Sequence, residues 1–390
     1  MKLCEILMGD IPRILPKVAE IRRHVHMYPE LSGEERETSA YVCRILEEHG
    51  ISYTVLPDGS GIVARVMGNA QYAIGIRAEL DALPMTEQTG LDYASRNEGV
   101  MHACGHDMHL AVALGFLLML KPHEDKLTCG VAVFFQPAEE TVGGADEMIR
   151  RGCLEDPPVH RVFGFHVTPS LSVGDVQFLP GVMNAAVTDF ELKVMGKSCH
   201  GAHPEQGVDA IVAGAAIVSA LQTVVSRNIA PTDSAVVTVG TFDGGTAGNI
   251  VAGEVSMNGT LRALDSAVMT ELKGAVSRVC EDTAAGYGAK VQLDFTTEYP
   301  PLCNDADLTA KLLDRAGQLL GKDKTHLMSA PSLGADDFAF FCQKVPGCYF
   351  NVGCRAEHLR DGQILHSPLF APDERCFRTA LQMLCLLIEE

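Results

Sequence analysis

The stretch YAIGIRAELDALP, residues 72–84, joins a short apolar run to two carboxylates. A continuous apolar run of this length is typical of a strand buried on both faces, so we predict a strand over 72–76. VAVFF at 131–135 and VFGF at 162–165 have the same character, and the segments between them are long enough for crossover helices such as 108–120. The alternation predicts an α/β fold with a mostly parallel central sheet flanked by helices.

A different pattern occupies residues 183–297. Strand-like FELKVMG is followed by a small-residue helix at about 207–228, then by VVTVGTF and EVSMNGTLRAL, a helix near 266–285 and AKVQLDF. This order predicts a compact α+β unit with an antiparallel sheet. We therefore expect one α/β domain, residues 1–182 and 298–390, interrupted by a smaller domain at residues 183–297.

Helices are also expected near both ends of the chain. Apolar residues recur at three- and four-residue steps from Ile11 to Val25, which predicts an amphipathic helix that ends before Pro29. Further helices are predicted at about 34–49, 305–320 and 373–388, with a strand at 348–353.

The composition limits the kinds of partner. Fifty acidic against 31 basic side chains leave the 390 residues with a formal charge of −19, which repels phosphate backbones and anionic membrane surfaces. Neither nucleic acid nor a membrane is therefore an expected partner. The start, MKLCEILMGD, lacks the charge and apolar length of a secretory signal, and we expect no stretch to reach the roughly 18 apolar residues of a membrane helix.

The thirteen cysteines are odd in number and scattered from Cys4 to Cys385 without a paired C-x-x-C spacing. In a large chain without a secretory signal, this distribution indicates reduced, mostly buried thiols. We therefore expect a cytoplasmic protein.

Side chains able to bind metal follow each of the three predicted strands. Ligand-handling groups gather at the carboxyl ends of strands in open α/β sheets. Glu79 and Asp81 follow the first strand, a Glu139–Glu140 pair follows the second, and His166 ends the third. The segment HACGHD, residues 102–107, adds a Cys-x-His pair, Cys104 and His106, just before the helix at 108–120.

Each of these signals has an ordinary structural explanation when taken alone. The glutamate pair could be a solvated helix start, Asp81 a turn residue before Pro84, His166 a hydrogen-bonded core histidine, and Cys104 a small buried hydrophobe. These explanations weaken together, because all four elements occupy equivalent places in one predicted sheet.

The residue types point to metal-assisted hydrolysis. Adjacent carboxylates can divide the work, with Glu140 binding a metal ion while Glu139 takes a proton from a metal-activated water. A Cys-x-His pair with further histidine and glutamate ligands suits zinc, manganese, cobalt or nickel better than magnesium or calcium. A set of five ligands is large enough for two ions that share one bridging ligand.

A set of motifs follows in order along the chain: RAELDALP, MHACGHDMHL, QPAEE, FGFHV, GKSCHGAHP, GGTAGN, GTLRAL, LGADDFAFF and LHSPLF. With these motifs in this order, the chain resembles the metal-dependent aminoacylase and carboxypeptidase amidohydrolases, most closely the branch of hippurate hydrolase, N-acetyldiaminopimelate deacetylase and the indoleacetyl-amino-acid hydrolases. The resemblance spans about residues 15 to 385.

The resemblance implies a di-metal exopeptidase-like fold and a two-metal site. By position, the Cys104 thiolate would bridge two divalent ions, and the other ligands would be His106, Glu140, His166 and His366. Glu139 falls on the family's general base, which would pass the proton to the leaving amine. Asp81 matches an aspartate that orients a ligating side chain. His366 could not have been chosen from spacing, because LHSPLF lies far from His166 in the chain and near no clear strand.

The inserted domain resembles the family's lid and dimerisation domain, which implies a homodimer. Its His200 matches a histidine that helps to stabilise the developing oxyanion, and Asn249 and Arg262 match substrate contacts. We expect His203 to be a surface residue or to lie behind the residues that contact the substrate. The chain departs from the usual family residues at three positions, which are Glu79, Cys199 and Asp336.

The resulting expectation is a cytoplasmic metallo-amidohydrolase that cleaves the linear amide bond of an N-acyl amino acid or a small peptide. A dipeptidase or aminopeptidase on the same scaffold is the near alternative. A non-catalytic binding protein and an enzyme with Cys104 as its nucleophile are the other two.

Overall fold

The structure is a computed structural model that describes residues 2–355 and 364–388. Its chain forms two compact units. Unit 1 comprises Met1–Gly181, Cys303–Ser329 and Asp337–Glu390, and unit 2 comprises Val182–Leu302 and Ala330–Asp336.

In its described residues, unit 1 contains an eight-stranded sheet of order β1-β2-β4-β3-β5-β16-β6-β15. The four central strands β4, β3, β5 and β16 run parallel, while β2 is antiparallel to β4 and β6 to β16. The predicted class, a mostly parallel sheet flanked by helices, is thus confirmed. The strand bounds are β1 (Ser52–Val55), β2 (Ile62–Val66), β3 (Ala73–Glu79), β4 (Gly130–Gln136), β5 (Val159–Ser172), β6 (Val176–Phe178), β15 (Thr325–Leu327) and β16 (Gly347–Arg355).

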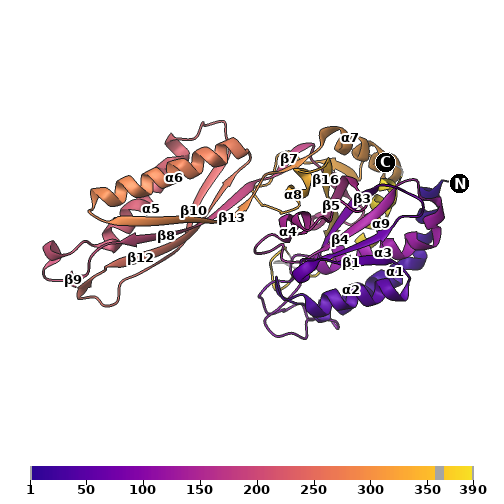
Figure 1. Ribbon diagram of the computed structural model, residues 1–390, viewed down its shortest axis with the longest axis horizontal. Helices are drawn as coiled ribbons and strands as arrows, with labels where there is room; N and C mark the ends of the chain where they lie inside the picture. The colour runs from indigo at the N-terminus through magenta and orange to yellow at the C-terminus, as the bar shows by residue number, and fades with distance from the viewer. Residues whose placement is uncertain (1, 356–363, 389–390) are drawn as a thin grey trace. The chain divides into compact units, whose positions relative to one another are not determined.

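The helices of unit 1 cover both faces of this sheet (Figure 1). The contacting helices α1 (Leu3–Met27), α3 (His106–Leu120) and α9 (Cys376–Leu387) share one large core with residues 131, 133 and 135 of β4. Phe134 points to the opposite face, where its ring stacks on Phe341 of α8 (Ala339–Cys342). The other helical segments are α2 (Arg36–Glu48), η1 (Pro57–Gly59), η2 (Lys121–Lys126), α4 (Gly144–Arg150) and α7 (Ala306–Leu320).

Helix α3 is buried along its whole length. After its polar first turn it is apolar on every side, as expected for a helix enclosed by the core. This burial bears on the candidate site, because the first residue of α3 is the predicted ligand His106.

Unit 2 has a four-stranded antiparallel sheet of order β10-β12-β8-β13 among its described residues. Helices α5 (Ala210–Arg227) and α6 (Ser266–Gly286) pack side by side on one face of it (Figure 1). The strand bounds are β8 (Ala186–Met195), β10 (Ala235–Gly244), β12 (Glu254–Ala263) and β13 (Lys290–Tyr299). Its shorter elements are β9 (Cys199–His200), which pairs with β11 (Ile250–Val251), and η3 (Pro204–Gln206). Strand β7 (Gly181–Asn184) pairs with β14 (Leu302–Asn304), and each of these two strands has residues in both units.

The structure differs from the sequence expectations in three ways. Unit 2 extends to Leu302 and takes in residues 330–336, which were expected to belong to the α/β domain. Strand β5 continues to Ser172, so His166 lies within it rather than at its end.

The third difference is that α5 is long and apolar enough to cross a membrane, contrary to the expectation that no stretch would be. A core helix of a soluble protein meets the same two criteria, and one face of α5 is buried in the core of unit 2 through Ala213, Ile217, Leu221 and Val224.

Candidate metal centre

Three neighbouring parallel strands bring the first candidate residues together. These strands lie in the order β4-β3-β5. Glu79, at the end of β3, is paired with Gln136, at the end of β4. Asp81 follows β3 by two residues, Glu139 and Glu140 follow β4, and His166 lies on β5. The carboxyl ends of parallel strands meet at one edge of the sheet, which explains the convergence.

Cys104 lies at the centre of the cluster. Its Sγ atom is 3.3 Å from Nε2 of His166 and 3.3 Å from Nε2 of His366. His366 reaches the cluster because its main-chain N–H donates to the carbonyl of Ala103 over 2.9 Å. His366 also has a φ of 59°, a costly left-handed conformation for a non-glycine residue that concentrates at functional sites.

A glycine allows Cys104 and His106 to face the same point. Gly105 has a φ of 95° and is the N-cap of α3, a conformation that an L residue adopts only at a cost. A Cβ atom there would also lie 2.5 Å from Cγ2 of Val167. Only glycine fits this turn without strain.

Asp81 fixes the ring of His106. The Nδ1–H group of His106 donates to the main-chain oxygen and to Oδ1 of Asp81, at 3.0 and 3.1 Å. The other carboxylate oxygen accepts from Oγ of Ser32 at 2.7 Å and from the main-chain N–H of Glu140 at 2.9 Å. Burial acts to raise the Asp81 pKa, but these hydrogen bonds, led by that from His106, hold the pKa below its ordinary value.

Glu139 and Glu140 lie in a turn between β4 and α4, so their interpretation as a solvated helix start is wrong. The turn is held at Ala138, which has a φ of 57° and whose N–H donates to Oε1 of Glu35 over 2.8 Å. Both glutamate side chains are about nine-tenths buried, and an oxygen of each lies 3.9 Å from Nε2 of His106. Oε1 of Glu140 is 3.3 Å from Nε2 of His366.

The donor atoms form two overlapping triads. Cys104, His106 and His166 make one, and Cys104, Glu140 and His366 make the other, with the donor atoms of each within 4.8 Å of one another. Cys104 is common to both, which is the arrangement that two ions bridged by one thiolate require. A further group joins Glu139 and Glu140 to His106.

The hydrogen bonds of the two buried histidines fit metal ligands. Ligating histidines almost always donate their second ring N–H to a carboxylate or a carbonyl. His106 does so to Asp81, and Nδ1 of His166 does so to the carbonyl of Val167 at 2.7 Å. In both cases the Nε2 atom is directed at the cluster. The sulfur, nitrogen and oxygen donors together suit borderline-soft divalent ions.

Burial and charge oppose one another at the centre. Burial raises the pKa of the Cys104 thiol well above its ordinary value, and the nearby Glu140 carboxylate adds to the effect against His106. Burial acts to lower the His106 pKa, but the nearby Cys104 and Glu79 side chains raise it above its ordinary value. A positive charge in the cluster would stabilise the Cys104 thiolate and so lower the pKa of this thiol.

Asp107 and His102, the other polar residues of HACGHD, differ in their hydrogen bonds: Asp107 has partners, whereas the His102 ring has no hydrogen bond within the described residues. Asp107 accepts from Nε of Arg22 at 2.7 Å and lies 2.8 Å from Nδ1 of His26, and so ties α3 to α1. His102 is fully buried, and burial lowers its pKa to about 4. Neither belongs to the two triads.

The three candidates in unit 2 lie on its own strands. His200 on β9 pairs with Ile250 of β11, and the next residue, Gly201, donates to the carbonyl of Asn249 over 2.8 Å, so the main chains around His200 and Asn249 are neighbours. Arg262 on β12 donates from Nη1 to the carbonyl of Leu333 at 2.8 Å. His203 is exposed, in keeping with its expected place on the surface.

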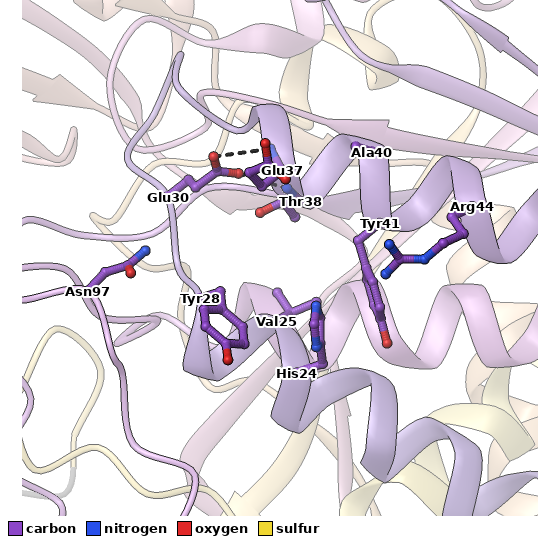
Figure 2. A pocket seen from close by; sticks show the side chains of 10 residues that line it. All are labelled: His24, Val25, Tyr28, Glu30, Glu37, Thr38, Ala40, Tyr41, Arg44 and Asn97. Atoms are coloured by element: carbon purple, nitrogen blue, oxygen red, sulfur yellow. Dashed lines mark hydrogen bonds between the residues drawn. The ribbon is translucent and has the colours of Figure 1, made fainter.

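A separate cavity of about 390 Å³ lies between α1 and α2 (Figure 2). Its wall includes His24 stacked on Tyr41 with ring centroids 4.0 Å apart, and Glu30, whose carboxylate accepts from two main-chain N–H groups of α2. None of the predicted site residues is among its described lining residues. The cavity therefore has no part in the candidate metal centre.

Sequence reasoning missed the role of four residues that support the centre. Ser32 and Glu35, which hold Asp81 and Ala138, gave no signal in the sequence. Glu79 was noticed as a metal-competent side chain after the first strand and as a departure from the family pattern, but not as the partner of His109. His109 could have been found, because it follows His106 by three residues on α3 and so lies on the same helix face.

Known proteins resemble the chain over most of its length. The family model Peptidase family M20/M25/M40 matches residues 75–390. The N-acetyl-L-cysteine deacetylase of Bacillus subtilis is 39% identical over 356 residues, 91% of this chain and 83% of that protein. An IAA-amino acid hydrolase of Arabidopsis thaliana is 37% identical over 359 residues, 91% of this chain and 81% of that protein.

A solved structure extends the likeness to three dimensions. The Bacillus subtilis YXEP protein, described as a dinuclear metal binding peptidase from the M20 family, aligns with a TM-score of 0.81 at 32% identity, covering 97% of this chain and 98% of that one. Fold, sequence and the clustered donor atoms agree: the chain is a metallo-hydrolase that belongs to the peptidase family M20/M25/M40.

Proposed function

We propose that this enzyme hydrolyses the amide bond between an acyl group and the α-nitrogen of an amino acid. The observation that carries the proposal is the pair of ligand triads that share Cys104, with the Glu139 carboxylate beside them. Both relatives described above are named for substrates in which an amino acid is the amine half of an amide.

The ligands of two divalent ions would be Cys104, shared, with His106 and His166 on one side and Glu140 and His366 on the other. Such ions, when bound, polarise a carbonyl and make water acidic enough to supply a nucleophile at neutral pH. The ions proposed are manganese, zinc, cobalt or nickel.

Glu139 is proposed as the general base. Its Oε2 lies 3.9 Å from Nε2 of His106, and its side chain is about one-tenth exposed, so water can reach it while the protein restrains it. The carboxylate would take a proton from the attacking water and return it to the departing amine nitrogen. The C–N bond of the amide breaks, and the products are the acyl group as a carboxylic acid and the amino acid with its free α-amine.

His200, Asn249 and Arg262 are proposed substrate contacts. An imidazole N–H suits a developing oxyanion, and a guanidinium suits the α-carboxylate of the substrate. A cytoplasmic location and a homodimer formed through unit 2 are also part of the proposal.

The test is a panel of N-acyl amino acids with acetyl, succinyl and aromatic acyl groups, assayed with Mn²⁺, Zn²⁺ and Co²⁺. We expect hydrolysis of at least one acyl class, loss of activity with a chelator and recovery with one of the ions. Free dipeptides form the second arm of the panel. Activity that requires a free amino terminus would replace the proposal with an exopeptidase, and a covalent acyl-enzyme resistant to chelators would replace it with a Cys104 nucleophile.

A further inference from the structure

A buried chain of hydrogen bonds runs from β3 through His109 of α3 to the neighbourhood of the proposed ligand His166. It starts at Arg77, whose guanidinium donates to Gln136 at 2.9 Å, to Asp337 at 2.7 Å and, over a short contact, to Oε1 of Glu79. Oε2 of Glu79 accepts from Nδ1 of His109 at 2.8 Å. Arg77, Glu79 and His109 are each at most 1% exposed.

His109 completes a strand. The pairing of β5 with β3 ends at Phe163, while β5 itself continues to Ser172. Beyond that point the main-chain N–H of Val167 donates to Nε2 of His109 over 3.0 Å, which replaces a sheet hydrogen bond. Because an N–H can only donate, Nε2 must carry the lone pair and Nδ1 the proton that Glu79 accepts. The two hydrogen bonds therefore fix both the ring and its tautomer.

Val167 passes this restraint to His166. The carbonyl of Val167 accepts from Nδ1 of His166 at 2.7 Å, and the ring then places Nε2 3.3 Å from Sγ of Cys104. The rings of His109 and His166 also meet edge to face, with centroids 4.7 Å apart. A change in His109 would thus alter the angle at which His166 presents Nε2.

We propose that His109, held by Glu79, is a positioning residue for the proposed ligand His166 and so controls one of the two ions selectively. The selectivity follows from the ligand sets, since His166 belongs to the triad of Cys104 and His106 and not to that of Cys104, Glu140 and His366. The inference rests on the proposed function only in taking these triads as the ion sites.

Two substitutions break the chain at different points. His109→Leu removes both the acceptor for Val167 and the donor to Glu79. Glu79→Gln is nearly isosteric, but Glu79 accepts from Arg77 with one oxygen and from His109 with the other, so the single amide oxygen of glutamine must give up one of them. His109→Gln keeps one acceptor and one donor and is the conservative rescue.

The experiment measures Co²⁺ binding without substrate, by competition with a chelator and by the visible spectrum of the bound ion. We expect the wild type to bind two ions, and His109→Leu to bind one of them 10- to 100-fold more weakly, an effect typical of groups that orient ligands. The other ion should change by less than about 3-fold. Glu79→Gln should weaken the same ion, and His109→Gln should recover most of its affinity.

Controls separate positioning from general damage. His366→Ala removes a ligand of the other triad and should weaken the other ion. His102→Leu replaces another buried histidine of the motif MHACGHDMHL, one that belongs to neither triad. Its affinities for the two ions should not separate from each other as those of His109→Leu do. Should His109→Leu fail to fold, Glu79→Gln and His109→Gln decide the matter.

Three results bear on the outcome. Wild-type affinities for both ions in Glu79→Gln and in any folded His109→Leu would overturn the inference. An equal loss of both ions, accompanied by a lower melting temperature of the metal-free variants, would also overturn it by showing a merely structural role. If the wild-type protein does not bind two ions, the result would instead contradict the proposed function.

Discussion

Oδ1 of Asp81 accepts a hydrogen bond from Nδ1 of His106 at 3.1 Å, while Oδ2 accepts from Ser32 and from the main chain of Glu140. One carboxylate therefore orients a proposed ligand ring and also anchors the main chain of another ligand. The substitution Asp81→Asn keeps the shape of the side chain but replaces an acceptor with a donor.

We expect Asp81→Asn to bind metal about 10- to 100-fold more weakly, because an amide cannot accept all three hydrogen bonds. The check is the chelator concentration that removes half of the bound ion. Ser32→Ala removes one of the three donors and should have a smaller effect in the same direction. Unchanged metal affinity in Asp81→Asn would show that the carboxylate does not orient His106.

Glu139 and Glu140 should separate on substitution although they are neighbours. Glu139→Gln removes the proposed base and should lower kcat by roughly 10²- to 10⁴-fold while the protein still binds two ions. Glu140→Gln removes a proposed ligand and should lower metal content together with activity. Metal analysis of the purified variants, beside kcat on the same substrate, distinguishes them. Equal loss of metal in both would contradict the division of labour.

Much of the fold could be predicted from local patterns. The apolar runs at 72–76, 131–135 and 162–165 correspond to β3, β4 and part of β5. The edge strands β1 and β15, and β6 next to β15, were not predicted, because they are short and largely lack an apolar run. The extent of β5 was missed for a physical reason: past Phe163 it stays paired with β16 on one side, while on the other side β3 has ended and the His109 side chain accepts from Val167 instead.

The candidate site was predictable where ligands follow strands. Asp81, Glu139, Glu140 and His166 could be grouped because parallel strands bring their carboxyl ends together. His366 could not, since its approach depends on one main-chain hydrogen bond to Ala103 and on a left-handed backbone. Such long-range contacts leave no trace in local periodicity, and only the family resemblance supplied that residue.

Gly105 should tolerate no side chain. Gly105→Ala adds the cost of a left-handed alanine, about 1–2 kcal/mol, and a Cβ that would lie 2.5 Å from Cγ2 of Val167. Gly90→Ala is the matched control, because Gly90 also has a positive φ, of 72°, but no atom within 4 Å of the added Cβ. We expect the first variant to be less stable than the second in urea unfolding, and Val167→Ala to recover part of the difference. Equal stabilities would show that the contact with Val167 costs nothing.

Glu35 should make stability depend on pH. Its carboxylate is 6% exposed, and burial raises its pKa above the ordinary value of 4.5, with the nearby Asp81 charge acting in the same direction. A carboxyl with a raised folded-state pKa stabilises the fold while it is protonated, and this contribution is lost as the pH rises from the unfolded-state pKa through the folded-state pKa.

Glu35→Gln cannot ionise, and its amide oxygen can still accept from Ala138. We therefore expect the unfolding free energy of the variant, relative to wild type, to increase from pH 4 towards pH 7. Urea unfolding at several pH values measures this difference, and a difference that is constant or falls with pH would contradict the assigned direction of the shift.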